Sequence, residues 1–396
     1  MAVTTPNQRA SEQPSLLYRA EVRQVIYQVL LVVALVSIGW WLVHNVAENL
    51  RRQNIASGFD FLWRTSGFDI SQSLIPYSNT SSYGRAFWVG LLNTLLVAGI
   101  GIIFATVLGF IIGIARLSTN WVIAKLAAVY VEVVRNLPLL LQLFFWYFAV
   151  LKNLPAPRQS IAVVGGGFLN VRGLYLPWPV PEPGFGAVTF AFAFGILASI
   201  GVSIWARRRQ IQTGQQFPVF WSSVGLIIGL PLLTYLVTGM PLHWEYPVLR
   251  GFNFQGGMVV QPEFLALLLG LSFYTASFIA EIVRAGILGV PKGQKEAAKA
   301  LGLTDRQMLR LVVIPQAARI IIPPLTSQYL NLTKNSSLAV AIGYPDFVSV
   351  FAGTVLNQTG QAVEIILMTM GVYLTISLLT SAFMNWFNRR MALVER

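Results

Sequence analysis

The sequence predicts an all-α membrane protein that crosses the bilayer about eight times, with both termini in the cytoplasm. Hydrophobic residues make up 55% of the 396 residues and charged residues only 11%, whereas a soluble domain carries about 25% charged residues. A transmembrane helix needs about 20 apolar residues. Eight runs reach or approach that length, and they cover residues 25–43, 87–115, 122–151, 187–206, 217–238, 263–285, 320–345 and 363–387.

The basic residues predict how these helices are oriented. With the N-terminus inside, the loops assigned to the cytoplasm hold about twice as many Lys and Arg residues as the outside loops, which is the usual bias of membrane proteins. The pair Arg51–Arg52, on the outside, argues mildly the other way. The same bias accounts for the net charge of +13, so no nucleic-acid partner is expected.

The run 25–43 is expected to stay in the protein as its first helix. Roughly two dozen polar residues precede it and no small-residue cleavage site follows it, which is unlike a removable signal peptide.

Several kinds of chemistry have no residues to support them. The chain has no cysteine, and its two histidines, His44 and His243, have no partners at ligand spacing, so we expect no metal site. A phosphate-binding loop of the type Gly-x-x-x-x-Gly-Lys-Ser/Thr is missing, so the chain should not hydrolyse ATP. No paired carboxylates or nucleophile–base arrangement indicates a catalytic residue, which argues against a membrane-embedded enzyme.

The cytoplasmic loop 286–319 predicts two short helices joined at a glycine. Pro291 suits the first turn of a helix over 292–301, which places Ala297, Ala300 and Leu301 on one face. Gly302 follows, at the position where a left-handed C-cap is needed.

The second helix of this loop begins with a capping box. Thr304 and Gln307 have the required spacing, and the helix is predicted to end at Pro315. Capped helices give the loop a compact, defined surface, which a passive connection does not need. The alternative is an amphipathic hairpin that lies on the lipid surface.

Three parts of the loop form a long, gapped motif: Glu296-Ala297-Ala298, Gly302 and Val312-x-Ile314-Pro315. The motif resembles the EAA loop of ATP-binding-cassette importer permeases. In that family the loop is a coupling helix that docks in a groove of a cytoplasmic ATPase. The resemblance implies an ATPase-coupling role for Glu296, Ala297, Ala298, Lys299, Gly302 and Pro315.

Further segments resemble the polar amino-acid permease subfamily of these importers. They are VGLLNTLL at 89–96, YVEVVRNLPLLLQLFF at 130–145, the stretch 273–303 and PPLTSQYLNLTKNSSLAVAIG at 323–343. Asn136 stands where the family usually has Gly, and Asn335-Ser336 where it usually has Asp-Thr. We expect these differences to shift substrate preference rather than remove activity.

Residues 51–62 and 67–78 resemble the larger permease subunit of the general L-amino acid transporters, which also carries an insert with extra helices. The resemblance implies the core of a type I importer transmembrane domain in the bacterial inner (plasma) membrane. It divides the chain into a tail, first helix and outside segment (1–86), a first core part (87–151), an insert with two extra transmembrane helices (152–262) and a second core part (263–396).

Three outside segments have an open role. Residues 44–86, 152–186 and 239–262 are either ordered caps that could dock a partner or plain connecting loops. The prolines of LPWPVPEPG in the second segment exclude a helix there.

The resemblance implies a permease subunit that carries L-amino acids through the membrane. Its implied partners are a second homologous permease subunit, two ATP-binding subunits, a periplasmic amino-acid-binding protein and membrane lipid. ATP and Mg would be bound by the ATPase, and this chain would need no cofactor. The alternative is an ion-coupled secondary amino-acid carrier, which has no use for an ATPase dock. The amino acids carried, the subunit that holds them and the choice between heterodimer and homodimer stay open.

Polar residues inside the predicted helices indicate where a substrate could bind. A charge at the bilayer centre costs about 2.5–3.5 kcal/mol, so these residues should line an interior cavity. A guanidinium binds a carboxylate with two hydrogen bonds, which suits Arg135, and an ammonium group needs a carboxylate such as Glu132 or Glu281. The candidate substrate-binding residues are Arg135, Glu132, Glu281, Gln142 and Lys334.

The alternative is a structural ion pair within each helix. Glu132 and Arg135 lie three residues apart, as do Glu281 and Arg284, so each pair shares one helix face. Arg284 is near the cytoplasmic edge, which favours the structural reading for its pair. Arg135 is next to Leu137–Pro138, where a helix can open and expose backbone to a ligand.

Overall fold

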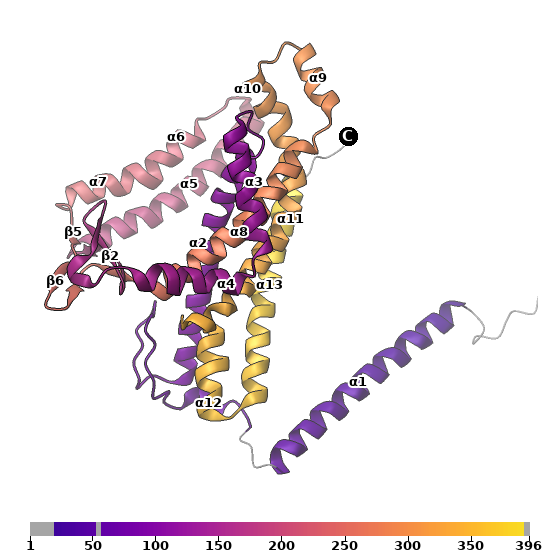
Figure 1. The fold of residues 1–396 in the computed structure, drawn as a ribbon. Helices are drawn as coiled ribbons and strands as arrows, with labels where there is room; N and C mark the ends of the chain where they lie inside the picture. The colour runs from indigo at the N-terminus through magenta and orange to yellow at the C-terminus, as the bar shows by residue number, and fades with distance from the viewer. Residues whose placement is uncertain (1–19, 53–56, 392–396) are drawn as a thin grey trace, which may run out of the picture.

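The computed structural model describes residues 20–52 and 57–391, and within them the protein is mainly helical (Figure 1). Seven helices of this described part are long and apolar enough to cross a membrane, and a bent helix pair makes an eighth crossing if it counts as one span. The predicted polytopic, helical class is therefore confirmed. The two chain ends, predicted to be cytoplasmic, fall outside the described residues.

The centre of the molecule is formed by α2 (Tyr83–Ala115), α8 (Pro262–Leu288) and α11 (Ile314–Asn335). Glycines on α2 let α8 approach closely, because they place no side chain between the two backbones. A Cβ atom at Gly109 would lie 2.6 Å from the Cβ of Ile279, and one at Gly113 would lie 2.7 Å from the carbonyl oxygen of Ala280. Larger side chains at these two positions would push the central helices apart.

A broken span lies against α8. It consists of α3 (Trp121–Asn136), α4 (Leu139–Phe144), the π-helical turn η3 (Phe145–Val150) and the 3-10 turn η4 (Leu151–Asn153). The predicted run 122–151 is therefore not one straight helix, since α3 and the segment that follows it meet at 108°. The backbone of Leu137 is extended, at φ −95° and ψ 132°, because Pro138 disfavours the helical conformation in the residue before it.

The insert contains a helical hairpin. Its members are α5 (Phe185–Thr213), α6 (Val219–Val224), the π-helical turn η6 (Gly225–Gly229) and α7 (Leu230–Val237). Gly195 allows α5 to touch the backbone at Leu226, and the Ser199 hydroxyl donates to the Ser223 hydroxyl at 2.7 Å. These are the two additional spans that the sequence predicted in this region.

Short strands, which the sequence analysis did not predict, join the outside segments of the insert. The strands β1 (Ile161–Val163), β2 (Gly167–Asn170), β3 (Gly173–Leu176) and β8 (Met258–Val260) form one antiparallel sheet in that order. Two further pairs join β4 (Trp178–Pro181) to β5 (Leu242–Glu245) and β6 (Val248–Arg250) to β7 (Asn253–Gln255). Figure 1 places this group at the end of the α5–α7 hairpin. These segments are ordered rather than plain connecting loops, whereas a docking role stays a prediction.

The loop that the sequence predicts to be cytoplasmic begins with α9 (Lys292–Ala300) and α10 (Asp305–Met308), followed by the π-helical turn η7 (Leu309–Val313) and then α11. The predicted end at Pro315 is wrong, because the helix continues without interruption from Asp305 to Ile342. A π-helical turn has wider spacing between donor and acceptor. This turn lies directly before Pro315, whose nitrogen has no hydrogen to donate to the preceding turn.

The last part of the chain folds back beside α2. It comprises η8 (Ser336–Ile342), the π-helical η9 (Val348–Val355), α12 (Leu356–Thr359) and α13 (Ala362–Met391). The fully buried carboxylate of Asp346 accepts hydrogen bonds from the Ser349 amide at 2.8 Å and the Tyr373 hydroxyl at 3.2 Å. On α2, the Thr94 hydroxyl accepts from the Phe347 amide at 2.9 Å. These polar contacts fix η9 between α2 and α13.

Helix α1 (Ala20–Arg52) stands apart from the other described helices (Figure 1). None of the residues in its candidate span, Val22–Val46, is buried. The segment after it contains η2 (Asp60–Trp63), whose Phe61 is fully buried against Tyr83 of α2. Another short helix, η5 (Pro157–Gln159), precedes the sheet of the insert.

Candidate functional site

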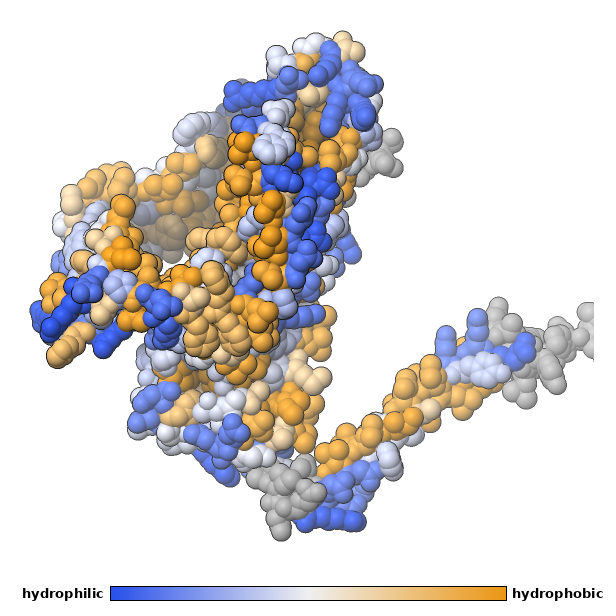
Figure 2. Space-filling model, in the orientation of Figure 1, coloured by the Kyte–Doolittle hydropathy of each residue, from blue (hydrophilic) through white to orange (hydrophobic). Residues whose placement is uncertain are grey.

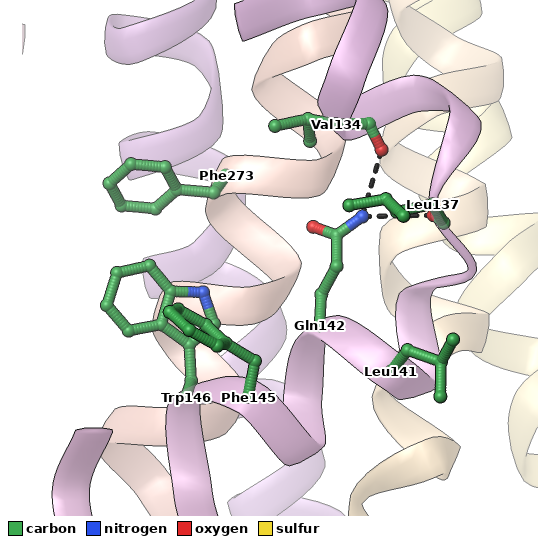
Figure 3. Close-up of a pocket in the computed structure, with 7 residues that line it drawn as sticks. All are labelled: Val134, Leu137, Leu141, Gln142, Phe145, Trp146 and Phe273. Carbon is green, nitrogen blue, oxygen red and sulfur yellow. Dashed lines mark hydrogen bonds between the residues drawn. The ribbon is translucent and has the colours of Figure 1, made fainter. Parts of the chain in front are cut away.

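The break between α3 and α4 frees backbone oxygens that one side chain then satisfies. Gln142, on α4, donates from Nε2 to the carbonyl oxygen of Val134 at 2.9 Å and to that of Leu137 at 3.0 Å (Figure 3). Its side chain is 9% exposed. Gln142 therefore holds the two helix segments at their angle, while its amide oxygen points toward the side of Phe273.

A cavity of about 320 Å³ lies inside this angle. Its walls are Val134, Leu137, Leu141, Gln142, Phe145, Trp146 and Phe273. The rings of Trp146 and Phe273 are 5.3 Å apart, and the Tyr130 hydroxyl donates to the Phe273 carbonyl at 2.6 Å. The cavity offers one polar side chain among apolar ones, so it suits an apolar group that presents a single hydrogen-bond donor.

The structure leaves Glu132 and Arg135 exposed on the last turns of α3. The Arg135 guanidinium lies 4.9 Å from the ring centre of Phe278, in the geometry of a cation–π contact. Within residues 20–52 and 57–391, the carboxylate of Glu132 forms no ion pair with Arg135. The ion pair within the helix, the alternative considered for these two residues, is therefore not formed. Both charged groups remain accessible beside the cavity rather than within its walls.

Glu281 is engaged in ion pairs, as its structural alternative predicted. Its Oε1 lies 2.6 Å from Nη2 of Arg284, and its Oε2 contacts Nη1 of Arg116. Arg116, just after α2, was missed because its partner is far away in the sequence and no local spacing could indicate the contact. Two guanidinium groups already neutralise this carboxylate, so Glu281 is not free to bind an ammonium group in this structure.

Lys334 belongs to a different cavity, of about 370 Å³. Its walls include Ser337, Val348, Tyr373, Leu374 and Ser377. Among the described residues, the ammonium group of Lys334 has no carboxylate partner. An unpaired cation beside serine hydroxyls suits an anionic group. Ser377 and Tyr373 are spaced four apart on α13, a signal that the sequence analysis did not use.

The predicted corner at Gly302 is confirmed in detail. Gly302 has φ +76°. Its amide donates to the carbonyl of Lys299 at 2.9 Å, and the Leu303 amide donates to the carbonyl of Ala298 at 3.2 Å. These two bonds form a Schellman C-cap. Ala298 is 3% exposed and packs inward, so it anchors the end of α9 to the protein.

The predicted capping box at the start of α10 is also present. The backbone amide of Gln307 donates to the Thr304 hydroxyl at 3.4 Å, and the backbone amide of Thr304 donates to Oε1 of Gln307 at 3.0 Å. Caps on both sides of the corner fix its shape. On its outward side, Leu301 is 81% exposed and Glu296 is exposed too. The loop therefore combines a rigid backbone with an accessible apolar and charged surface.

Several membrane-crossing helices around a broken one, with a rigid capped loop at one end, suit a membrane transport protein. The chain belongs to the family of binding-protein-dependent transport system inner membrane components, whose family model matches residues 192–393. It is therefore a multi-pass protein of the inner membrane. The resemblance seen in the loop motif is confirmed.

Two relatives match nearly the whole chain. The General L-amino acid transport system permease protein AapQ of Rhizobium johnstonii is 59% identical, over 96% of this chain and 95% of the relative. The Putative amino-acid ABC transporter permease protein YhdX of Escherichia coli is 58% identical, over 95% of each chain. Among solved structures, the crystal structure of an amino acid ABC transporter with histidines matches 78% of this chain and 95% of that chain, at 21% identity and a TM-score of 0.47.

Proposed function

We propose that this chain is the membrane-spanning permease subunit of an ATP-binding-cassette importer for L-amino acids. The observation that carries the proposal is the capped corner at Gly302, which holds a rigid surface away from the helices. Membership of the family supports it, as do two relatives whose names refer to amino-acid transport. An ion-coupled secondary carrier, the alternative, finds no support in the family.

The exposed side of α9 is the proposed contact for a cytoplasmic ATPase. Leu301 projects from the corner, and covering a leucine side chain contributes about 1.5–3 kcal/mol to association. Glu296 has no ion-pair partner in the described chain, so its carboxylate is available to a basic residue of the ATPase. Ala297 and Lys299 lie on the exposed surface beside it. ATP and Mg would be bound, and ATP hydrolysed, by that partner.

The complete transporter would contain four kinds of component. Besides this chain, we propose a second homologous permease subunit, two ATP-binding subunits and a periplasmic amino-acid-binding protein. The ordered strands of the insert support the last of these, because they form a defined surface at the far end of the α5–α7 hairpin, away from α9 and α10 (Figure 1). A rigid surface loses less conformational entropy on docking than a mobile loop does.

For the substrate, we propose that Arg135 binds the carboxylate and Glu132 the ammonium group of the amino acid. Both side chains are exposed beside the Gln142 cavity, which could take an apolar side chain. Lys334 and its serine neighbours offer a second place for a carboxylate along the path. Glu281 has no part in this proposal, since Arg284 and Arg116 occupy it.

The test is uptake by purified components in lipid vesicles. The chain alone should neither hydrolyse ATP nor accumulate amino acids, whereas the complex purified from native membranes should accumulate them only with ATP and the binding protein. Mass spectrometry of that complex identifies the partners. Uptake by the chain alone, driven by a sodium or proton gradient without ATP, would overturn the importer proposal.

A further inference from the structure

An apolar groove runs between α2 and α13 and has no occupant among the described helices. Its volume is about 600 Å³. Trp88, Leu91 and Leu95 of α2 form one wall, and a stripe of α13 with Gly371 and Thr375 forms the other. A second cavity, of about 420 Å³, shares Trp88 and extends the groove toward the outside segment.

Gly371 indicates that another helix fits this groove. A Cβ atom at Gly371 would have no neighbour within 4 Å, so none of the described contacts requires a glycine there. Glycine inside a helix destabilises the helix relative to alanine, so its presence needs another reason. In membrane helices, small residues such as Gly371 and Thr375, four positions later, allow a second helix to approach closely.

Helix α1 has the complementary feature. Figure 2 shows it apolar along most of its length and polar at both ends. Gly39 of α1 also has open space where a Cβ would be. Val36, Gly39, Val43 and Val46 follow the spacing of one helix face, which Trp40 borders, whereas Trp41 lies on another face. This valine–glycine face is small enough to enter a groove between two helices.

The chain connection brings α1 to the mouth of the groove. The Gly58 amide donates to Oε1 of Glu364, at the start of α13, at 2.6 Å. Arg52, the last residue of α1, is six positions before Gly58, so this connection reaches about 20 Å at most. The outer end of α1 is therefore tethered beside the outer end of α13.

The small residues of the two helices lie at the same depth. Gly39 is 13 residues before Arg52, which is about 20 Å along a helix. Gly371 and Thr375 are 9 and 13 residues after Ala362, the first residue of α13, which is about 14 and 20 Å. With their outer ends side by side, the two helices would bring Gly39 opposite the segment 371–375.

We propose that α1 packs in the groove between α2 and α13 of its own chain, antiparallel to α13, with its valine–glycine face inward. The other candidates for this groove are a lipid acyl chain and a helix of another subunit. Neither is tethered at its mouth by a short connection. The inference is independent of the substrate and of the ATPase.

Cysteine cross-linking tests this packing in the assembled complex in native membranes. The natural chain has no cysteine, so introduced thiols have no competitor within it. Two facing pairs are made, Val46→Cys with Met368→Cys near the outer end and Val36→Cys with Leu379→Cys deeper in the membrane. Both should form intrachain cross-links with a short bis-maleimide, detected as linked peptides in a species of single-chain mass.

Matched controls decide whether the face and the groove are correct. Trp41→Cys with Thr375→Cys has similar depth but the wrong face, and Val46→Cys with Leu232→Cys on α7 uses a helix outside the groove. The facing pairs should link severalfold more than either control. Adding Gly371→Leu should reduce their linking severalfold, whereas Gly371→Ala should reduce it less. Equal linking in all pairs, or a product of twice the chain mass, overturns the proposal.

Discussion

At the end of α3, the carbonyl oxygens of Val134 and Leu137 lose their helical partners, and both accept hydrogen bonds from Gln142. A single amide thus replaces two missing backbone donors at a proline break. The arrangement keeps a cavity open without burying a charge. Gln142, proposed from the sequence as a substrate ligand, has a definite structural role in addition.

Replacing Gln142 with Leu should destabilise the protein. Two partly buried carbonyl oxygens would lose their donor, and an unsatisfied group costs up to about 1–3 kcal/mol when it is fully buried. Thermal unfolding of the purified complex measures the effect. Leu141→Ala is the control, since Leu141 is largely exposed on the same short helix. Equal unfolding temperatures for Gln142→Leu and the natural protein would contradict the role of the amide.

Replacing Arg135 with Lys should weaken substrate binding although the charge is kept. Lysine cannot form the planar, two-bond contact of a guanidinium with a carboxylate. Losing one charge-assisted hydrogen bond costs about 1.5–3 kcal/mol, which corresponds to roughly a tenfold to hundredfold loss of affinity. Amino-acid uptake by the assembled transporter, measured over a range of substrate concentrations, shows the change.

The double change of Glu132→Gln with Arg135→Gln serves as the second arm of this experiment. Because the structure shows no ion pair between these residues, the two charges do not neutralise each other, and removing both should act on substrate binding. Uptake should therefore fall strongly. Near-normal uptake by this neutral variant would rule out Arg135 as the carboxylate ligand.

Sequence spacing indicated the local contact of Glu281 with Arg284 but not whether such a pair forms, since Glu132 and Arg135 have the same spacing and do not pair, and it missed contacts between distant segments. Glu281 and Arg284 are one helical turn apart, so their ion pair could be foreseen. Arg116 joins the same carboxylate from α2, and only the close packing of α2 on α8 brings it there. Ser377 beside Lys334 was missed for the same reason, since it comes from a different helix.

At the scale of elements, the loop between α8 and α11 was the most predictable part. Capping boxes and glycine C-caps depend on residues three to five positions apart, and the structure contains both. The π-helical turn before Pro315 was not predicted. Proline usually ends a helix, yet this helix continues through Pro315 and, further on, through Pro323 and Pro324.

Gly302→Val should uncouple the transporter without unfolding it. A β-branched residue at φ +76° is strained by about 1–3 kcal/mol, so the corner should change its angle and bind the ATPase less firmly. The amount of ATPase retained during affinity purification of the complex is the readout. Full retention together with normal uptake would refute the coupling role.

Gly293→Ala is the matched control for this change. Gly293 lies in α9 and a Cβ atom there would have no neighbour within 4 Å. Its φ is not positive, so alanine fits without strain. This variant should retain the ATPase and transport normally.

At the scale of the whole molecule, the insert adds a strand-containing cap to the helical bundle. Runs of only three or four residues leave little periodic signal in a sequence, and one of the pairings joins distant segments, as Leu174 with Val260. The prolines indicated that the segment is not helical, but not what its strands pair with. The helical hairpin of the same insert was predicted because its apolar runs are long.

Deleting residues 160–180 should abolish association with the external binding protein. The deletion removes β1 to β3 and leaves β8 without its partner strand. Co-purification of the binding protein and uptake measure the loss. Val164→Lys provides a milder variant, because this side chain is 99% exposed at a turn and the sheet should persist. Intact association and uptake after the deletion would show that the insert is not the docking surface.

The uninterrupted helix from Asp305 to Ile342 has a mechanical consequence. At the α-helical rise its 38 residues would span about 57 Å, with the Gly302 loop at one end and Lys334 near the other. A displacement of the loop would move this helix and so shift the wall of the Lys334 cavity. Pro315, Pro323 and Pro324 each remove a backbone donor, so the helix should flex at these points. The displacement that reaches Lys334 would then depend on how easily the helix bends at these prolines.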